Sequence, residues 1–183
     1  MTRLHTPRWA WALTGSGHFF VESFDLIRTL EHCDVFVSKA ANEVLRMYKL
    51  KLDFPETMRV LHDKTASSVP IGGFYTGVYH TAVIAPATSN TVAKCVAGIS
   101  DSLPTNVYAQ AGKCLVPSIV FACDTAPELE TMAPSGMVKV YPRPIDLENT
   151  AKLKTYERTR VVESLAELIE TITARQKVIS GDG

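Results

Sequence analysis

The sequence predicts a single α/β domain, residues 1–183, built on a doubly wound and mostly parallel sheet. Short, fully apolar runs such as Ser118–Ala122 are typical of strands that are buried on both faces. Between these runs lie longer segments in which apolar residues recur at helical spacing. A chain of 183 residues that is 46% hydrophobic suffices for one buried core. The predicted architecture is a three-layer sandwich with helices on both faces of the sheet.

The first part of the chain predicts two strands, each followed by a helix. Trp9–Leu13 is the first strand, and apolar residues at helical spacing predict a helix over His18–Glu31. Asp34–Val37 is the second strand, and Lys39–Tyr48 is the helix that follows it.

The middle of the chain predicts another strand and two helices. The strand lies within Val78–Ala85 and is stopped by Pro86. Ser89 or Asn90 is expected to cap the next helix. A short helix over Leu103–Gly112 ends at its glycine, which is a common C-terminal stop.

The last part of the chain predicts a central strand over Ser118–Ala122. Residues 134–144 are expected to form a loop around a short strand, Met137–Val140. One long amphipathic helix is predicted over Asn149–Gln176, and its apolar side is a candidate subunit interface.

The charge balance argues against a polyanionic partner. Lys and Arg number 19, as do Asp and Glu, and no basic run is interleaved with aromatic residues. We therefore expect no nucleic-acid partner. The uncharged stretch between Lys64 and Lys94 is interrupted by proline and glycine, so we expect no membrane helix. No secretory signal is seen and the four cysteines form no CxxC pair, which favours a cytoplasmic protein with reduced thiols.

Three strand ends carry small or hydroxyl residues, where an open α/β sheet binds ligands. The first is Thr14-Gly15-Ser16-Gly17, whose glycines let an anion approach the backbone. Its spacing is neither the GxGxxG fingerprint nor the Walker pattern, so a tight turn without a ligand is the alternative.

The second strand end is Ser38-Lys39, where the hydroxyl either contacts a phosphate or only caps the next helix. The third is the run from Pro86 to Thr91, which places four small polar residues at a strand-to-helix junction. This number exceeds what one helix cap requires. The run therefore predicts a site for a phosphate or for the edge of a polar heterocycle.

The run Val83–Lys94, read together with Gly98–Leu103, resembles the flavin-binding core of the homo-oligomeric flavin-containing cysteine decarboxylases. The turn Thr14–Gly17 and Ser38 match the phosphate-binding turns of that family, and the matches span most of Trp9–Cys123. The resemblance implies a Rossmann-like, flavodoxin-type sheet and FMN bound where subunits meet. It also implies a homo-oligomer built from trimers, with which a larger cage is compatible. The residues then expected to bind FMN are Thr14, Gly15, Ser16, Gly17, His18, Ser38, Lys39, Pro86, Ala87, Thr88, Ser89, Asn90, Thr91 and Cys123.

Two segments depart from the decarboxylase pattern. Decarboxylases of the family carry a catalytic histidine before the Pro-Ala-Thr strand, whereas Pro70–Tyr75 contains none. They also carry a Pro-x-Met-Asn-x-x-Met substrate clamp, where this chain has Ala122–Glu128. Both departures argue against cysteine decarboxylation.

The segments Ala133–Lys139 and Arg143–Asp146 resemble the archaeoflavoprotein branch of the family instead. That resemblance implies an oxidoreductase of one-carbon metabolism that reduces dihydromethanopterin to tetrahydromethanopterin by electron transfer through FMN. The sequence does not identify its electron donor, for which NAD(P)H and a protein donor are both open.

The candidate catalytic residues are Asp124, Tyr75 and His80. A carboxylate at Asp124 could hold the amide edge of a pterin, and the alternative is a simple helix cap. His80 is more often a hydrogen-bonded structural residue in such a position. His18 opens a helix, where it either contacts the ligand or only shields a phosphate.

Other functions remain open from the sequence. Cys95, Cys114 and Cys123 raise the alternative of an iron–sulfur cluster, but their spacing is not a ferredoxin pattern, so buried thiols and no metal site are favoured. A flavin prenyltransferase would need a prenyl-phosphate pocket with basic residues, for which Lys39, Lys94 and Arg143 are the candidates. A cysteine decarboxylase and a non-catalytic FMN carrier complete the alternatives.

Overall fold

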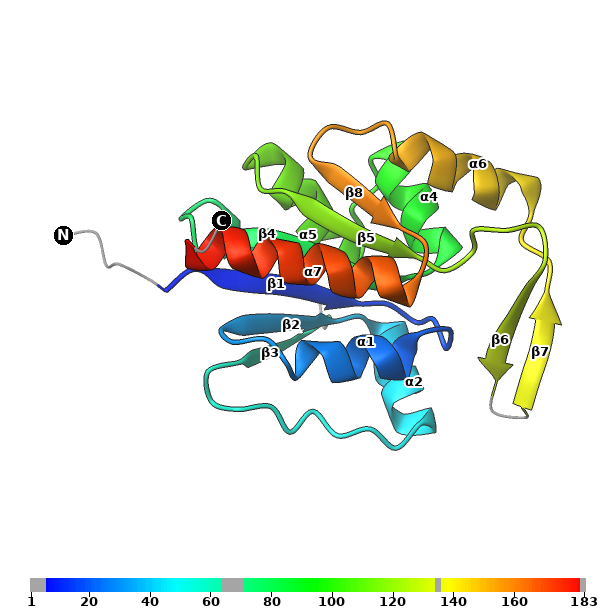
Figure 1. Ribbon diagram of the computed structural model, residues 1–183, viewed down its shortest axis with the longest axis horizontal. Helices are drawn as coiled ribbons and strands as arrows, with labels where there is room; N and C mark the ends of the chain where they lie inside the picture. Colours follow the sequence, from blue (N-terminus) through cyan, green and yellow to red (C-terminus); the bar gives the residue numbers. More distant parts are fainter. Residues whose placement is uncertain (1–5, 64–70, 134–135, 182–183) are drawn as a thin grey trace.

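The computed structural model describes residues 6–63, 71–133 and 136–181 (Figure 1). Six parallel strands form one sheet in the order β3-β2-β1-β4-β5-β8. Counted along the chain, this is the 3-2-1-4-5-6 order of the doubly wound nucleotide-binding folds. The strands are β1 (Arg8–Leu13), β2 (Cys33–Val37), β3 (Arg59–His62), β4 (Tyr79–Ala87), β5 (Ser118–Ala122) and β8 (Thr159–Val162).

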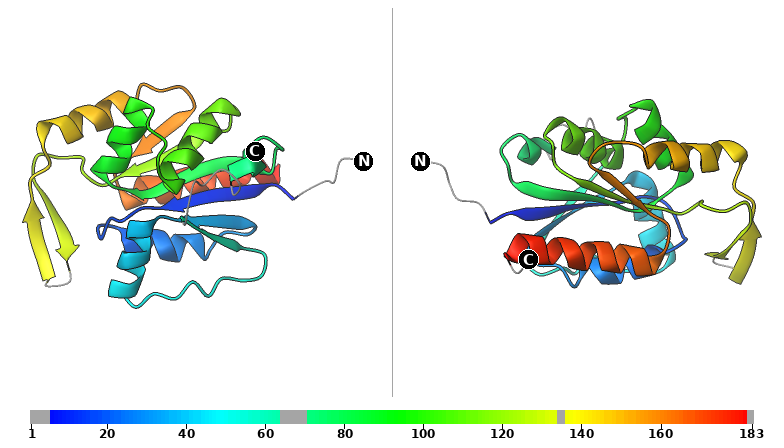
Figure 2. Two further views of the ribbon diagram at one scale, coloured as in Figure 1. Left: turned by 180° about the vertical axis from the view of Figure 1, so that it is seen from behind. Right: turned by 45° about the horizontal axis from the view of Figure 1, so that its top comes forward.

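Helices cover both faces of this sheet (Figures 1 and 2), which confirms the predicted Rossmann-like, flavodoxin-type three-layer sandwich. On one face lie α1 (Phe20–Ile27), α2 (Lys39–Met47) and α7 (Leu165–Ser180). On the other face lie α4 (Ser89–Ala97), α5 (Leu103–Lys113) and α6 (Pro144–Leu153). A short 3₁₀ helix, Gly72–Phe74, precedes β4.

Strand β1 separates the two cores because its side chains alternate between the faces. Trp9, Trp11 and Leu13 pack beneath α1 and α7, whereas the small Ala10 and Ala12 face α5. The Trp11 indole is fully buried and its Nε1–H donates to the backbone oxygen of Ala85 at 2.7 Å. This bond satisfies a buried donor and ties β1 to β4.

A two-stranded hairpin stands beyond the carboxyl end of the sheet (Figures 1 and 2). Its strands are β6 (Leu129–Ala133) and β7 (Gly136–Val140), which pair antiparallel. The short strand predicted over Met137–Val140 is confirmed as part of β7, and residues 141–143 form the loop expected after it, up to the start of α6 at Pro144. β6 was missed because Leu129–Ala133 lies outside the sheet and carries no core pattern.

The prediction of one helix over Asn149–Gln176 was wrong. The structure has α6, then the edge strand β8, and then α7 in this region. Arg158 adopts a left-handed conformation with φ 58°, and the β-branched residues of Thr159–Val162 favour a strand. The Ser164 side chain then caps α7 by accepting from Glu167 N–H at 3.2 Å. The apolar residues of α6, β8 and α7 happen to follow one another at helical spacing, and this spacing led to the prediction of a single helix.

Smaller boundaries also differ. β4 continues through Pro86 to Ala87, since the pairing with β5 is irregular between Ile84 and Ala87 and needs no N–H from the proline. Thr88, rather than Ser89 or Asn90, caps α4.

Helix boundaries shift at two further places. Gly112 does not end α5, which runs to Lys113 and is followed by Cys114. α1 begins at Phe20 rather than His18, because Phe19 has a left-handed backbone with φ 58°. Pro70, Pro134 and Ser135, quoted in the sequence comparisons, lie outside the described residues. In the described part of the chain, no helix has the length and apolarity needed to cross a membrane.

Candidate functional site

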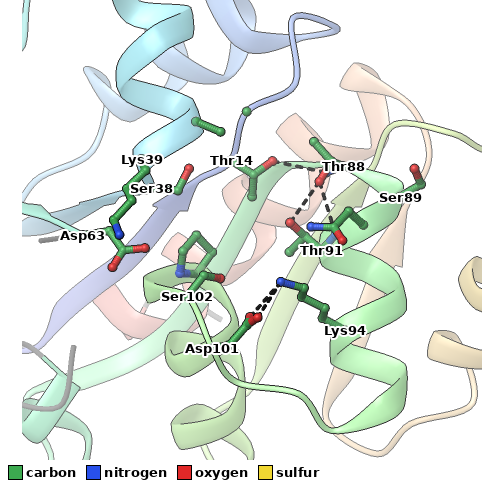
Figure 3. Close-up of a pocket in the computed structure, with 14 residues that line it drawn as sticks. Thr14, Ser38, Lys39, Asp63, Thr88, Ser89, Thr91, Lys94, Asp101 and Ser102 are labelled. Atoms are coloured by element: carbon green, nitrogen blue, oxygen red, sulfur yellow. Dashed lines mark hydrogen bonds and ion pairs between the residues drawn. The ribbon is translucent and has the colours of Figure 1, made fainter. Parts of the chain in front are cut away.

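Two cavities open at the carboxyl end of the sheet, where the strand order reverses between β1 and β4. We call them the first and the second cavity. The first has a volume of about 580 Å³ and lies between the starts of α2, α4 and α5 (Figure 3). Its lining is Thr14, Gly15, Ser38, Lys39, Ala40, Asp63, Thr88, Ser89, Asn90, Thr91, Lys94, Asp101, Ser102 and Pro104.

Three of the predicted hydroxyls are used to build the wall of the first cavity (Figure 3). The Thr14 hydroxyl donates to the backbone oxygen of Pro86 at 2.7 Å and accepts from Thr88 N–H at 3.2 Å. The Thr88 hydroxyl accepts from Thr91 N–H at 3.2 Å and lies 3.0 Å from the Thr91 hydroxyl. These bonds fix the strand ends of β1 and β4 against each other and cap α4.

Two helix N-termini face the first cavity, which favours an anion there because the N-terminal N–H groups and the helix dipole both present positive charge. Ser38 caps α2 by accepting from Ala41 N–H at 3.0 Å, and Thr88 caps α4. The Ser38 hydroxyl keeps its own proton available for a ligand.

The two lysines of the first cavity differ in whether their ammonium group is already paired with a carboxylate. Lys94 Nζ lies 2.8 Å from both carboxylate oxygens of Asp101, and this bond lowers the pKa of Asp101. Within residues 6–63, 71–133 and 136–181, the side chains of Lys39, Ser89 and Asn90 make no hydrogen bond. A ligand in the first cavity therefore meets one uncommitted cation and two uncommitted polar side chains.

The second cavity, of about 350 Å³, lies between the Gly15–His18 turn, α2 and the β6–β7 hairpin. Gly15 lines both cavities. Ser16, Gly17, His18, Cys123 and Asp124 line the second cavity only, so the structure divides the predicted cofactor residues between two adjoining spaces. Pro86 and Ala87 line neither cavity and shape the wall through the buried end of β4.

His18 is held in the second cavity by the hairpin. Its Nδ1 lies 2.8 Å from the Thr131 hydroxyl of β6, and its ring packs against Phe19. Burial lowers the pKa of His18, and the nearby charges of Asp124 and Glu22 oppose this only in part. The imidazole is therefore uncharged at neutral pH.

Cys123 is buried beside His18 and behaves as a structural thiol. Its Sγ lies 3.8 Å from the backbone oxygen of His18, which it faces as a donor. Burial raises the pKa of Cys123 to about 12, so the thiol stays protonated and is a poor nucleophile. Cys95 is buried within α4, and Cys114 follows α5 half-buried. Among the described residues, no three His, Cys, Asp or Glu side chains cluster closely enough to hold a metal ion.

The structure does not bring Tyr75 and His80 into either cavity of the same chain. Both lie near the amino end of β4, whereas the cavities lie at its carboxyl end. Tyr75 is 67% exposed and its hydroxyl donates to Gln110 Oε1 at 2.6 Å. His80 packs edge-on against Trp9, and burial with the charge of Arg175 lowers its pKa to about 4.

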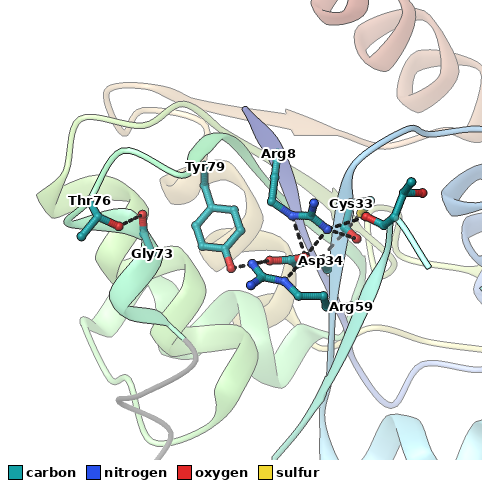
Figure 4. A network of polar contacts seen from close by, with 8 residues as sticks. Arg8, Cys33, Asp34, Arg59, Gly73, Thr76 and Tyr79 are labelled. Carbon is teal, nitrogen blue, oxygen red and sulfur yellow. Dashed lines mark hydrogen bonds and ion pairs between the residues drawn. The ribbon is translucent and has the colours of Figure 1, made fainter. Parts of the chain in front are cut away.

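An ionic cluster around the buried Asp34 occupies the same amino end of the sheet (Figure 4). Asp34 of β2 is fully buried and accepts from Arg8 Nε at 2.8 Å, from Arg59 Nε at 2.9 Å and from the Tyr79 hydroxyl at 2.7 Å. Burial disfavours the carboxylate, but these hydrogen bonds outweigh it and lower the pKa of Asp34. The cluster joins four neighbouring strands and lies far from the cavities, which indicates a structural role.

Sequence reasoning missed four polar residues of the first cavity: Asp63, Lys94, Asp101 and Ser102. Asp63 accepts from Leu103 N–H at 3.1 Å and so positions the start of α5. Asp63 could not be recognised as a residue at a strand end because β3, which ends at His62, was not predicted. Lys94 and Asp101 stood in the quoted motif, but their ion pair depends on the packing of α4 against the loop before α5.

Comparison with known proteins gives consistent matches. An uncharacterized protein of Methanocaldococcus jannaschii is 32% identical over 89% of this chain and 92% of its own length. A dihydromethanopterin reductase (acceptor) of Methanosarcina mazei is 38% identical over 64% of this chain, and the chain spans only 55% of that relative. DmrB of Burkholderia xenovorans, a cubic protein cage for redox transfer in complex with FMN, is 49% identical and superposes with a TM-score of 0.87 over 95% of this chain and 97% of its own. The profile of the Flavoprotein family matches residues 1–179, and the chain belongs to that family.

Proposed function

We propose that this chain is an FMN-dependent oxidoreductase that reduces dihydromethanopterin to tetrahydromethanopterin. The observation that carries the proposal is the first cavity, in which two helix N-termini and the uncommitted Lys39 converge on one space. The 49% identity to an FMN-bound redox protein and the 38% identity to a named reductase support the cofactor and the substrate.

The residues present fit FMN. A phosphate monoester is doubly charged, and α2 offers it N-terminal N–H groups, the Ser38 hydroxyl and the Lys39 ammonium. The polar edge of an isoalloxazine needs donors and acceptors, which the free side chains of Ser89 and Asn90 supply at the start of α4. A volume of about 580 Å³ lies in the range of small-molecule sites.

FMN, when bound, would supply the two electrons that the C=N bond of the dihydropterin takes up as a hydride at carbon, with a proton added at nitrogen. The role of the chain's own residues is to bind the cofactor and to orient the reacting rings. Lys39 and Ser38 would hold the phosphate, and the hydrogen bonds of Thr14, Thr88 and Thr91 keep the strand ends that line the first cavity fixed. An external two-electron donor, NAD(P)H or a redox protein, completes the cycle.

The assembly belongs to the same proposal. We infer a homo-oligomer built from trimers, because the related DmrB forms a cubic cage and another flavoprotein of the same fold is dodecameric. We also propose that the protein works in the cytoplasm, where the cysteines would stay reduced.

One experiment tests the reaction directly. The purified protein is loaded with FMN, reduced with one equivalent of dithionite without oxygen, and mixed with dihydromethanopterin. The expected result is recovery of the oxidised-flavin absorbance together with one tetrahydromethanopterin per flavin. A reduced flavin that dihydromethanopterin leaves unchanged would contradict the reductase and favour the FMN carrier.

The cofactor site is tested separately with Lys39→Met. Loss of a charge-assisted contact should weaken FMN binding roughly 10- to 100-fold in a fluorescence titration. Lys51→Met is the matched control, since Lys51 is exposed and lies outside both cavities. Equal FMN affinity of the two variants would remove Lys39 from the site.

A further inference from the structure

The second cavity differs from the first in chemical character. Its walls are largely apolar, with Val44 and Met47 of α2 on one side and Val140 of β7 on the other. Among the described residues that line it, none is an uncommitted cation, so the second cavity is poorly suited to a phosphate. Largely apolar walls with a few polar groups are instead typical of sites that bind a heterocyclic ring. Because Gly15 borders both cavities, a ring in the second lies next to a ligand in the first.

Polar groups gather where Asp124 and His18 line this cavity. In the described part of the chain, the Asp124 carboxylate has neither a hydrogen bond nor an ion pair. The charged groups that face it are few: Arg143 interacts with it at a distance, but the Arg143 guanidinium is bound to Asp146 Oδ1 at 2.8 Å. His18 is uncharged and already bonded to Thr131. Asp124 is thus a half-buried carboxylate that lacks donors.

A pterin ring presents the donors that such a carboxylate needs. Its 2-amino group and its N3–H lie side by side on one edge and point the same way, as the two N–H groups of a guanidinium do. A carboxylate accepts both at once, and such bidentate, charged bonds are the strong and directional ones. The rest of the bicyclic ring is flat and suits apolar walls.

We propose that the second cavity receives the pterin ring of the substrate and that Asp124 binds its 2-amino group and N3–H. The inference rests on the proposed function and adds the residue that selects the substrate. Asp124 acts by recognition: it fixes the ring beside Gly15 and so presents it to whatever the first cavity holds. An electron acceptor without this pair of donors gains nothing from Asp124.

The inference predicts a reversal of preference. 6-Methyllumazine differs from 6-methylpterin in carrying an oxygen in place of the 2-amino group, so it offers one acceptor and one donor on that edge. Asp124 would repel that oxygen, whereas an asparagine amide could donate to it and accept from N3–H. Asp124→Asn should therefore exchange which of the two rings binds better.

Calorimetric titration of the FMN-loaded, oxidised protein measures this without turnover. The wild type should bind 6-methylpterin roughly tenfold or more tightly than 6-methyllumazine, and Asp124→Asn should abolish or invert that ratio. Asp25→Asn is the matched control, because Asp25 is exposed on α1, and it should keep the wild-type ratio. Retention of the wild-type ratio in Asp124→Asn, with a normal FMN content, would overturn the inference.

A kinetic arm separates this inference from the proposed function. Reduced wild type that fails to transfer electrons to dihydromethanopterin contradicts the function, whatever the calorimetry shows. If the wild type reacts, Asp124→Asn should raise the KM for dihydromethanopterin roughly 10- to 100-fold. An unchanged KM for the pterin in Asp124→Asn overturns the inference alone.

Discussion

Asp34 is the residue on which the amino end of the sheet depends. It is fully buried and satisfied by two guanidinium groups and a phenol. Asp34→Asn leaves Arg8 and Arg59 without their counter-charge, so we expect a loss of about 3 kcal/mol in the free energy of unfolding, measured by urea denaturation. Asp53→Asn removes an exposed partner of Arg28 and should cost less than about 0.5 kcal/mol. Equal effects of the two substitutions would show that the cluster is not structural.

His80 makes stability depend on pH. Its pKa is about 4 in the folded protein and near its ordinary value of 6.5 when unfolded, so the unfolded chain binds the extra proton between these values. Stability is therefore fully present above about pH 6.5 and is lost as pH falls toward 4. For a half-buried ring we expect a loss of about 1–2 kcal/mol between pH 7 and pH 5.

His80→Gln should lose less stability than the wild type over the same pH interval, as measured by urea denaturation at pH 7 and pH 5. His32→Asn is the control, because His32 has φ 50° and asparagine tolerates this backbone. That variant should keep the wild-type pH dependence. A His80→Gln protein with the full wild-type loss would assign the effect to other groups.

Among the structural elements, the turn after β1 is the most tightly constrained. A Cβ placed on Gly15 would lie 2.4 Å from the Cβ of Ala40 at the start of α2. Gly15→Ala should therefore push α2 away, lower the free energy of unfolding by about 1–3 kcal/mol and weaken FMN binding. Gly112→Ala is the contrasting change: its Cβ meets nothing within 4 Å and lies within α5, so it should stabilise by about 0.5–1 kcal/mol. Thermal unfolding with and without FMN distinguishes the two, and a stable Gly15→Ala protein with normal FMN affinity would contradict the close contact.

The elements also show what local pattern can predict. β1 and β5 were found almost to the residue because both are buried on each face and read as continuous apolar runs. β8 was missed since it is an edge strand whose Arg160 is exposed and whose apolar residues continue the spacing of the neighbouring helices. The turns that line the first cavity were located from their small residues, but Asp63 and the Lys94–Asp101 pair needed tertiary packing to become visible. The sequence also could not predict that the hydroxyls of Thr14, Thr88 and Thr91 are used in hydrogen bonds within the protein, because those bonds depend on the tertiary structure.

At the scale of the whole molecule, the two cavities lie at the carboxyl end of the sheet and the ionic cluster lies at its amino end. The hairpin extends past the carboxyl end of the sheet, and Met137 on β7 and Tyr141 just after it are exposed. For the proposed assembly, native mass spectrometry should give masses that are multiples of three chains of 20.1 kDa. A monomeric mass at micromolar concentration would contradict the trimer.

The position of Gly15 has a thermodynamic consequence. One backbone segment forms a partition between two compartments, so any occupant that displaces it on one side reshapes the other. By reciprocity, the factor by which the first occupant alters the affinity of the second equals the factor of the reverse effect. Loading order and release order at this partition are thus coupled by a single free energy, which competition titrations from both directions would report as the same number.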